Sequence, residues 1–336
     1  MPPALGAEPR ARGTEPGTRG TEPGARGTEA AGLEPFYHAV EGYRLTDLRR
    51  LLAAPLAPGR DSANRSYFEG KLAIAEYRHA DADQLADRCA RQARNDAERS
   101  RCAELAAEGV ALAIALSGDD LARLGMISTL RAHLADAVRF DARNPHAQQL
   151  LARFYRVAPW FLGGGGAAAT RAMRAAITLL PTRADEFLGI DAFDARHWIE
   201  AIAYLQRVVD RDPGRAAAAY YLALACDKAN QRSRAIKVLA VVVAAHPEFW
   251  DAQFQLGTLS LDSDPRFAAQ VLTRFSNAAT PGPKRLANAW WRIGVAEESQ
   301  GRPEAALKAY RTALRYKPGH NEAQAGVQRL SRAASH

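Results

Sequence analysis

The sequence contains few residues whose types and spacing could support catalysis. Gly163 to Gly166 precede a predicted helix, and backbone NH groups in such a run can bind an anion. The glycines are followed by AAATR, without the GK[ST] that a phosphate-binding loop needs. Glu297 and Glu298 are adjacent, so on a helix they point about 100 degrees apart, which disfavours a paired acid and base. These residues therefore predict no catalytic site.

Signatures for metal binding and nucleophilic catalysis are also missing from the sequence. It contains no HExxH and no GxSxG, and its 8 histidines lack metal-ligand spacing. Cys89, Cys102 and Cys226 are odd in number and include no CxxC pair. We expect them to be buried thiols in a reducing compartment. The sequence thus predicts a protein without cofactor, metal or enzymatic activity.

Composition and charge narrow the class of protein. The 336 residues are 47% hydrophobic and 24% charged, as in globular proteins. No apolar stretch reaches the roughly 20 residues of a membrane span, and residues 1–32 lack the apolar core of a signal peptide, so we expect a cytoplasmic location. The formal charge of +8 leaves nucleic acid open as a partner. That charge is spread along the chain, which favours a solvated outer face instead.

Residues 1–35 differ from the rest of the chain. They repeat a heptapeptide, GTEPGTR at 13–19 and GTEPGAR at 20–26, and carry too few apolar side chains to offset the entropy of ordering. The segment predicts a disordered tail, which is either a flexible tether or a repeat expansion without a task.

From residue 36 onward, apolar residues recur at helical spacing and no convincing strand pattern is present. The sequence therefore predicts an all-α protein. Helices are expected at 62–78, 81–95, 97–116, from Asp119 or Asp120 to about 140, at 145–156 and at 321–333.

The C-terminal half of the chain is periodic. Four segments end in proline at intervals of 34, 34 and 37 residues, at Pro213, Pro247, Pro281 and Pro318. Small residues recur within them at Gly189, Ala223, Gly257 and Gly294, and alanines follow twelve residues later at Ala201, Ala235, Ala269 and Ala306. A small residue lets two helices approach closely, and proline prevents the second helix from continuing.

These positions resemble the tetratricopeptide repeat (TPR), a 34-residue helix-turn-helix unit. The best match is the last segment, in which Trp290, Ile293, Gly294, Gly301, Ala306, Tyr310, Ala313 and Pro318 are in register. The resemblance implies a right-handed TPR-type solenoid. We expect diverged helical pairs over 36–181, four repeats over 182–320 and a C-terminal capping helix over 321–336.

The resemblance also implies a binding surface. In a TPR solenoid the first helix of each repeat lines a concave groove, and aromatic anchors with a polar rim suit peptide binding. The residues expected there are Arg183, Glu186, Tyr220, Asp227, Asp251, Phe254, Asn288, Trp291 and Glu298. A register error of one place would instead make the aromatic residues part of the helix core.

The predicted function is a non-catalytic scaffold or adaptor that binds a protein or peptide in this groove. A receptor subunit that carries a small ligand in the groove is the alternative, because Phe154, Tyr155, Ala158, Pro159, Gly163 and Gly164 resemble a loop of TPR proteins related to a periplasmic uptake component. Without such a role, the loop is a connector whose Trp160 and Phe161 fold back onto neighbouring helices. RNA binding is disfavoured, because the groove residues include acidic Glu186 and Asp251.

Overall fold

The computed structural model describes residues 33–54, 62–117, 120–278 and 281–333, and within these ranges the chain is helical without strands. The predicted tail falls mainly on residues 1–32, outside the described part of the chain. The N-terminal helices are α2 (Leu45–Ala53), α3 (Ser62–Ala75), α4 (His79–Gln92), α5 (Asp96–Leu116), α6 (Asp120–Phe140), α7 (Pro145–Val157) and α8 (Gly166–Leu179). Residues 36–41, before α2, are also helical.

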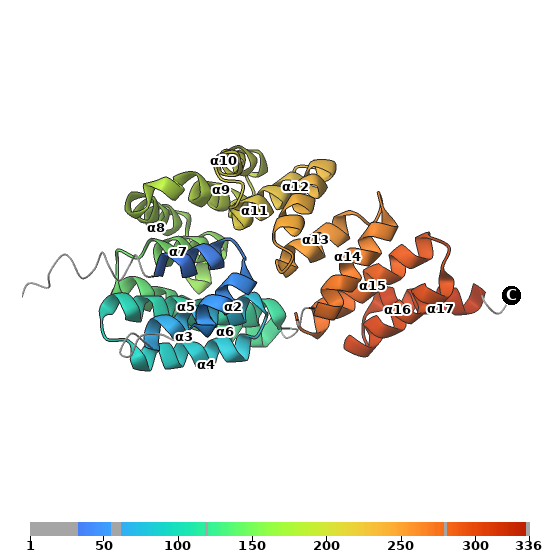
Figure 1. Ribbon diagram of the computed structural model, residues 1–336, viewed down its shortest axis with the longest axis horizontal. Helices are drawn as coiled ribbons and strands as arrows, with labels where there is room; N and C mark the ends of the chain where they lie inside the picture. The colour runs from blue at the N-terminus through green and yellow to red at the C-terminus, as the bar shows by residue number, and fades with distance from the viewer. Residues whose placement is uncertain (1–32, 55–61, 118–119, 279–280, 334–336) are drawn as a thin grey trace, which may run out of the picture. The chain divides into compact units, whose positions relative to one another are not determined.

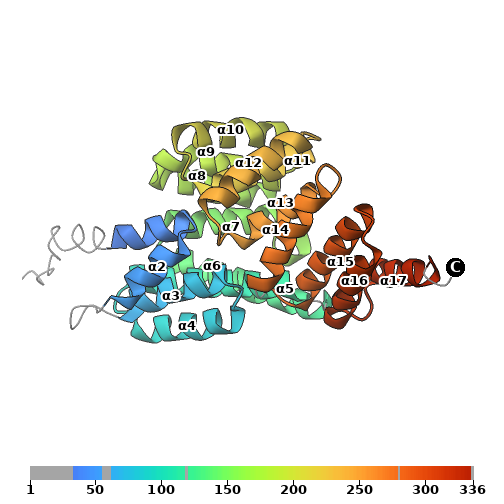
Figure 2. The same ribbon diagram turned by 45° about the vertical axis from the view of Figure 1, so that its right-hand side comes forward.

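The C-terminal helices follow the predicted repeats. They are α9 (Ala184–Asp194), α10 (Trp198–Arg211), α11 (Ala216–Lys228), α12 (Arg232–Ala245), α13 (Trp250–Leu259), α14 (Pro265–Ala278), α15 (Pro283–Ser299), α16 (Pro303–Tyr316) and α17 (Asn321–Ala333). Consecutive helices form antiparallel pairs stacked in chain order (Figures 1 and 2). The described residues from 36 onward therefore form the all-α helical-repeat solenoid that the sequence predicts.

The small residues pack as expected, but their partners lie one helical turn further on. A Cβ on Gly189 would be 2.6 Å from Leu205 Cγ, and one on Gly257 would be 2.6 Å from Leu272 Cγ. At Gly294 the obstructing group is the Tyr310 ring. These residues lie three or four positions after the recurring alanine, so each glycine makes room for a large apolar side chain of the second helix.

The turns inside several pairs share one backbone feature. Tyr43, Tyr77, Arg196, Asn230 and Gly301 have φ between 49° and 68°, in the left-handed region. Tyr43 and Tyr77 are 34 residues apart, as are Arg196 and Asn230. The repeat period therefore extends to the N-terminal pairs, where the small residues do not show it. The left-handed turn at Tyr77 also explains the bounds of two helices. α3 ends at Ala75, before the predicted 78, and α4 begins at His79, before the predicted 81.

The cysteine prediction is wrong for two of the three residues. Cys89 on α4 and Cys102 on α5 form a disulfide, 13 residues apart in sequence, whereas Cys226 is a buried free thiol. The sequence shows only the separation of the cysteines. Packing of α4 against α5 brings the two Cα atoms to 5.4 Å, within the range that a disulfide spans.

The glycine loop also differs from both of its interpretations. Gly163, Gly164 and Gly165 donate their NH groups to the carbonyl oxygens of Trp160, Pro159 and Tyr155, so these donors are not available to an anion. Trp160 and Phe161 do not fold back onto neighbouring helices. Their side chains are 84% and 64% exposed.

Candidate functional site

The first helices of the predicted repeats, α9, α11, α13 and α15, carry most of the residues expected to line the groove. The turns of the first helical pairs pack against the surface near these helices. Residues 41–49, which span the first turn and the start of α2, contact the N-terminal ends of α9, α11 and α13. Tyr77, in the second turn, contacts α13. We call this surface the closed stretch of the groove, and its residues are Arg183, Glu186, Arg215, Tyr220, Phe249, Asp251 and Arg285.

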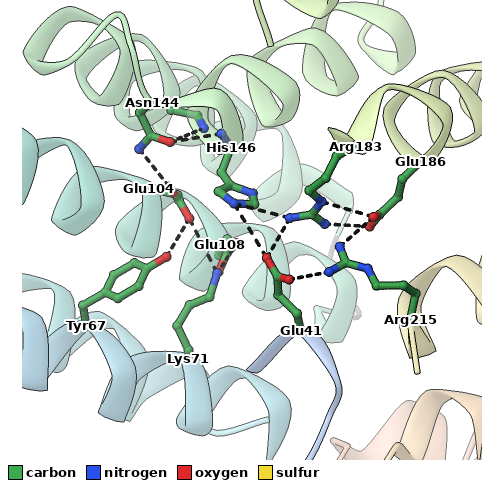
Figure 3. A network of polar contacts seen from close by, with 11 residues as sticks. Glu41, Tyr67, Lys71, Glu104, Glu108, Asn144, His146, Arg183, Glu186 and Arg215 are labelled. Carbon is green, nitrogen blue, oxygen red and sulfur yellow. Dashed lines mark hydrogen bonds and ion pairs between the residues drawn. The ribbon is translucent and has the colours of Figure 1, made fainter. Parts of the chain in front are cut away.

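A carboxylate of the first turn lies between two arginines of the closed stretch (Figure 3). Glu41 is 2.7 Å from Arg183 Nη1 and 2.5 Å from Arg215 Nη1. Glu186, which is 3% exposed, accepts hydrogen bonds from the same two arginines, each at 2.6 Å. Burial raises the pKa of Glu41, but Arg183, Arg215 and His146 lower it by more, so its pKa lies below its usual value. Two carboxylates thus compensate two guanidinium groups within a largely buried cluster.

Further apolar and polar contacts join residues 41–49 to the closed stretch. The Tyr43 ring stacks on Phe249 at 3.7 Å between centroids, and Phe249 also contacts Tyr220 at 5.1 Å. Thr46 Oγ1 donates to Glu248 at 3.0 Å, and Arg49 pairs with Glu248 at 2.5 Å. Behind them, Leu45 and Leu48 of α2 are buried. The first turn is therefore held by its contacts with Phe249 and Glu248 and by the buried leucines of α2.

The charged cluster continues into the N-terminal pairs (Figure 3). Glu104 accepts a hydrogen bond from Tyr67 at 2.8 Å and from Asn144 at 3.0 Å, and Lys71 pairs with Glu108 at 2.6 Å. Burial raises the pKa of Glu104, but Lys71 and its other neighbours lower it below its usual value. At Glu108 burial prevails, and the pKa is raised. Each group has a partner from another helix, so the cluster ties α3, α5 and α7 together.

The second turn continues the closed stretch at α13. Asp251 accepts a hydrogen bond from Tyr77 Oη at 2.8 Å and pairs with Arg285 at 2.5 Å. The Arg285 guanidinium also lies 4.8 Å from the centre of the Phe254 ring. Leu112 and Leu116 of α5 join the apolar cluster that includes Phe254. Asp251 and Phe254 are therefore brought together, under cover of the N-terminal pairs.

A different environment surrounds α15 and the start of α17, which we call the C-terminal stretch, with residues Asn288, Trp291, Arg292 and His320. Asn288 Oδ1 is 3.0 Å from His320 Nε2, and the Trp291 ring lies 5.6 Å from the imidazole of His320. The half-buried Arg292 guanidinium lies 4.9 Å from the Trp291 ring and 5.4 Å from the Phe254 ring.

Arg292 differs from the arginines of the closed stretch because it has no ion pair among the described residues. Its hydrogen bond goes to the backbone carbonyl of Asn288, at 3.1 Å. Burial lowers the pKa of Arg292, and the attraction of Glu322 offsets this only in part. A cation held between two aromatic rings without a carboxylate is suited to receive an anionic group.

Two of the predicted groove residues stand apart from these clusters. Asp227 is half-buried near the end of α11, and its carboxylate makes no contact with a cation in the described ranges. Glu298 accepts from Tyr310 Oη and pairs with Arg329 of α17, both at 2.7 Å. Glu298 of α15 therefore holds α17, the C-terminal capping helix, in place through its ion pair with Arg329.

Sequence reasoning missed Glu41, Arg215, Phe249, Arg285 and Arg292 as groove residues. Arg215 and Phe249 are 34 residues apart, each directly before or at the start of a first helix, so the repeat alignment could have found them. Glu41 has no such signal, because its partners lie 142 and 174 residues away.

Two surface hollows lie elsewhere, mainly on the second helices. One, of about 530 Å³, is lined mainly by polar groups of α14 and by Glu297 and Arg302. The other, of about 570 Å³, lies along α16 beside Lys308, Arg311 and Arg315. Neither resembles the closed apolar pocket that a small-ligand receptor needs.

The residues that the structure describes lack two further features. They contain no group of three or more His, Cys, Asp or Glu side chains arranged to hold a metal ion. They also contain no helix long and apolar enough to cross a bilayer.

Comparisons with known proteins bear on the fold. Tetratricopeptide repeat profiles match residues 192–257 and 287–320. The chain is similar to the structure titled human IFIT1 dimer with PPP-AAAA, with a TM-score of 0.59 and 14% identity over 92% of this chain and 71% of that one. It is also similar to a chain of the APC/C hetero-tetramer Cut9-Hcn1, with a TM-score of 0.56 and 13% identity over 87% of this chain and 53% of that one. No curated protein matched the sequence.

Proposed function

We propose, on the premise that this chain is a tetratricopeptide-repeat protein, that it is a non-catalytic scaffold that binds a protein partner in its groove. The repeats and the similar folds support a role in protein interaction. The proposal assigns the contact to the C-terminal stretch, with Asn288, Trp291 and Arg292 as its binding residues. In the closed stretch, Arg183, Glu186, Tyr220 and Asp251 hold the solenoid together instead.

The observation that carries this assignment is the unpaired Arg292. Arg183, Arg215 and Arg285 each pair with a carboxylate of the chain itself, whereas Arg292 is half-buried between two rings and pairs with no carboxylate in the part of the chain that the structure describes. A partly buried cation without an ion pair is unfavourable unless a partner supplies the counter-charge. A peptide with a carboxylate beside an apolar side chain would supply that charge and cover the Trp291 ring.

The test is a peptide-display selection against the full chain. We expect enrichment of peptides with Asp, Glu or a free C-terminal carboxylate next to an apolar residue. For a selected peptide, Arg292→Ala and Trp291→Ala should each weaken binding about tenfold or more, because each removes a central contact. The matched control is Arg311→Ala, an exposed arginine on α16. Equal binding by Arg292→Ala and the wild type would contradict the proposal.

We also propose that nucleic acid is not a partner of this protein. The cations of the closed stretch are already compensated by Glu41, Glu186 and Asp251, so they offer little to phosphates. Filter binding with random single-stranded RNA at physiological salt should give only weak, strongly salt-dependent retention. Tight retention that Arg292→Ala abolishes would replace the peptide with a nucleic acid.

The disulfide bears on the compartment in which the protein works. A cytoplasmic location predicts reduced thiols, whereas Cys89 and Cys102 are bonded and buried. We therefore propose that the protein works in an oxidising compartment. Labelling free thiols in protein isolated without reductant should modify Cys226 alone after denaturation. Modification of all three cysteines would support the cytoplasm.

A further inference from the structure

The loop between α7 and α8 displays an apolar patch that the groove does not explain. Trp160, Phe161 and Val157 are 84%, 64% and 62% exposed. The Trp160 and Phe161 rings touch edge to face at 5.9 Å between centroids. Burying such rings in water-free surroundings is strongly favourable, so two adjacent exposed aromatic residues indicate a contact surface.

The loop is built to hold these rings outward. Pro159 begins the one-turn helix η1 (Trp160–Leu162), and Gly163, with φ of 91°, ends it. A Cβ on Gly164 would collide with the carbonyl oxygen of Ala158, so only glycine fits there. Gly165 NH donates to the Tyr155 carbonyl oxygen at 2.9 Å and closes the loop onto α7. The aromatic residues therefore project from a braced turn.

The surroundings of the patch are basic. Residues 142–184 contain six arginines and no aspartate or glutamate. Arg153 and Arg156 pair with Asp194 and Asp191 of α9. Arg143, Arg171 and Arg174 are exposed and have no ion pair in the described part of the chain. This segment thus keeps uncompensated positive charge.

Two features bring that charge to the loop. Arg171 and Arg174 are three residues apart on the exposed face of α8, and side chains on a helix lean toward its N-terminus, which is here the loop end. The exposed Arg131 of α6 lies over Gly163, because its Nη1 is 2.7 Å from the position of a Cβ on that residue. Aromatic residues at the tip and arginines around it form a single surface.

We propose that this surface, residues 157–162 with Arg131, Arg171 and Arg174, docks the protein onto a bilayer that contains anionic phospholipid. Tryptophan and phenylalanine partition into the interfacial region of a membrane, and arginines attract anionic headgroups over roughly a Debye length. An acidic protein would satisfy the arginines equally well. The bilayer is favoured because the rings form a small projecting tip. Such a tip inserts into the interfacial region of a membrane more readily than it packs against a flat protein surface.

The experiment is co-sedimentation of the full chain with vesicles of phosphatidylcholine alone or of phosphatidylcholine and phosphatidylglycerol at 3:1. We expect binding to the anionic vesicles that weakens as salt rises. The double variant Trp160→Ala/Phe161→Ala should lower the partition coefficient about tenfold or more. Arg171→Gln/Arg174→Gln should lower it about 25-fold on anionic vesicles, since each of the two arginines near the surface contributes about 1 kcal/mol, or about fivefold.

Matched controls exist elsewhere on the molecule. Ile199→Ala/Val241→Ala removes two side chains that are each 68% exposed, and Arg311→Gln/Arg315→Gln removes the same charge from α16. Both control variants should bind as the wild type does. Absence of vesicle binding, or equal binding to neutral vesicles, would overturn the proposal. So would a concentration-dependent dimer that the Trp160→Ala/Phe161→Ala variant loses, because the patch would then join two copies of the chain.

Discussion

The closed stretch and the C-terminal stretch of the groove contain the same kinds of residues in different surroundings. In the closed stretch every arginine is matched, Arg183 and Arg215 by Glu41 and Glu186, and Arg285 by Asp251. In the C-terminal stretch Arg292 has aromatic neighbours on two sides and no ion pair with a carboxylate among the described residues. The difference teaches that lining the groove does not define a binding residue. What matters is whether the chain itself already supplies the partner.

The largest expected effect tests whether the closed stretch is structural. Arg215→Ala leaves Glu41 and the 3% exposed Glu186 with one cation between them. Breaking a buried ion cluster on one side costs roughly 3–5 kcal/mol. Chemical denaturation should show a drop of that size in the free energy of unfolding. A loss below about 1 kcal/mol would mean that the first turn is not held by this pair.

The second effect concerns the disulfide, which lies in the N-terminal pairs that close the groove. Reduction of Cys89–Cys102, which are 13 residues apart, should lower stability by about 3 kcal/mol, because the reduced unfolded chain regains conformational freedom. Hydrogen exchange should increase first in α4 and α5, and least in α16 and α17. Uniform exchange across the molecule would show that both stretches unfold as one unit.

The third effect is the pH dependence of the closed stretch. Burial lowers the pKa of His146 below its usual 6.5, so the unfolded chain binds a proton more readily than the folded one between the two values. Stability should therefore fall as pH drops below about 6.5. His146→Gln should reduce that fall, whereas the exposed His197→Gln should leave it unchanged. Denaturation midpoints at pH 7.5 and pH 5.5 measure the difference, and identical slopes would exclude His146 as a source.

The smallest effect belongs to the C-terminal stretch. Arg292→Met keeps the packing against Trp291 and Phe254 while it removes a partly desolvated charge without an ion pair. We expect the free energy of unfolding to change by no more than about 1 kcal/mol, because removing a partly buried charge is neutral or stabilising. The contrast with Arg215→Ala is the sharpest test of the comparison. Comparable losses from the two variants would show that Arg292 is also structural.

Much of the fold was predictable because the repeat signals are local. The glycines and alanines at fixed spacing, and the prolines that end each unit, act within one helical pair, so the sequence predicts α9 to α17 closely. The N-terminal pairs were harder, because their register survives in the backbone turns at Tyr43 and Tyr77 and not in the small residues. For the groove, the period places Arg183, Glu186, Tyr220 and Asp251 near the first helices. The repeat period does not indicate which segments of the chain cover these residues.

The sequence by itself determined the helices, the repeat register and the residues available to the groove, because helical periodicity and close helix packing depend on neighbours within about 34 residues. Tertiary structure alone decided which stretch of the groove is closed. Contacts such as Thr46 with Glu248 join residues 202 positions apart, and no local pattern encodes them. The same holds for the Cys89–Cys102 bond and for the exposure of Trp160. Each depends on where whole helices lie after the solenoid has formed.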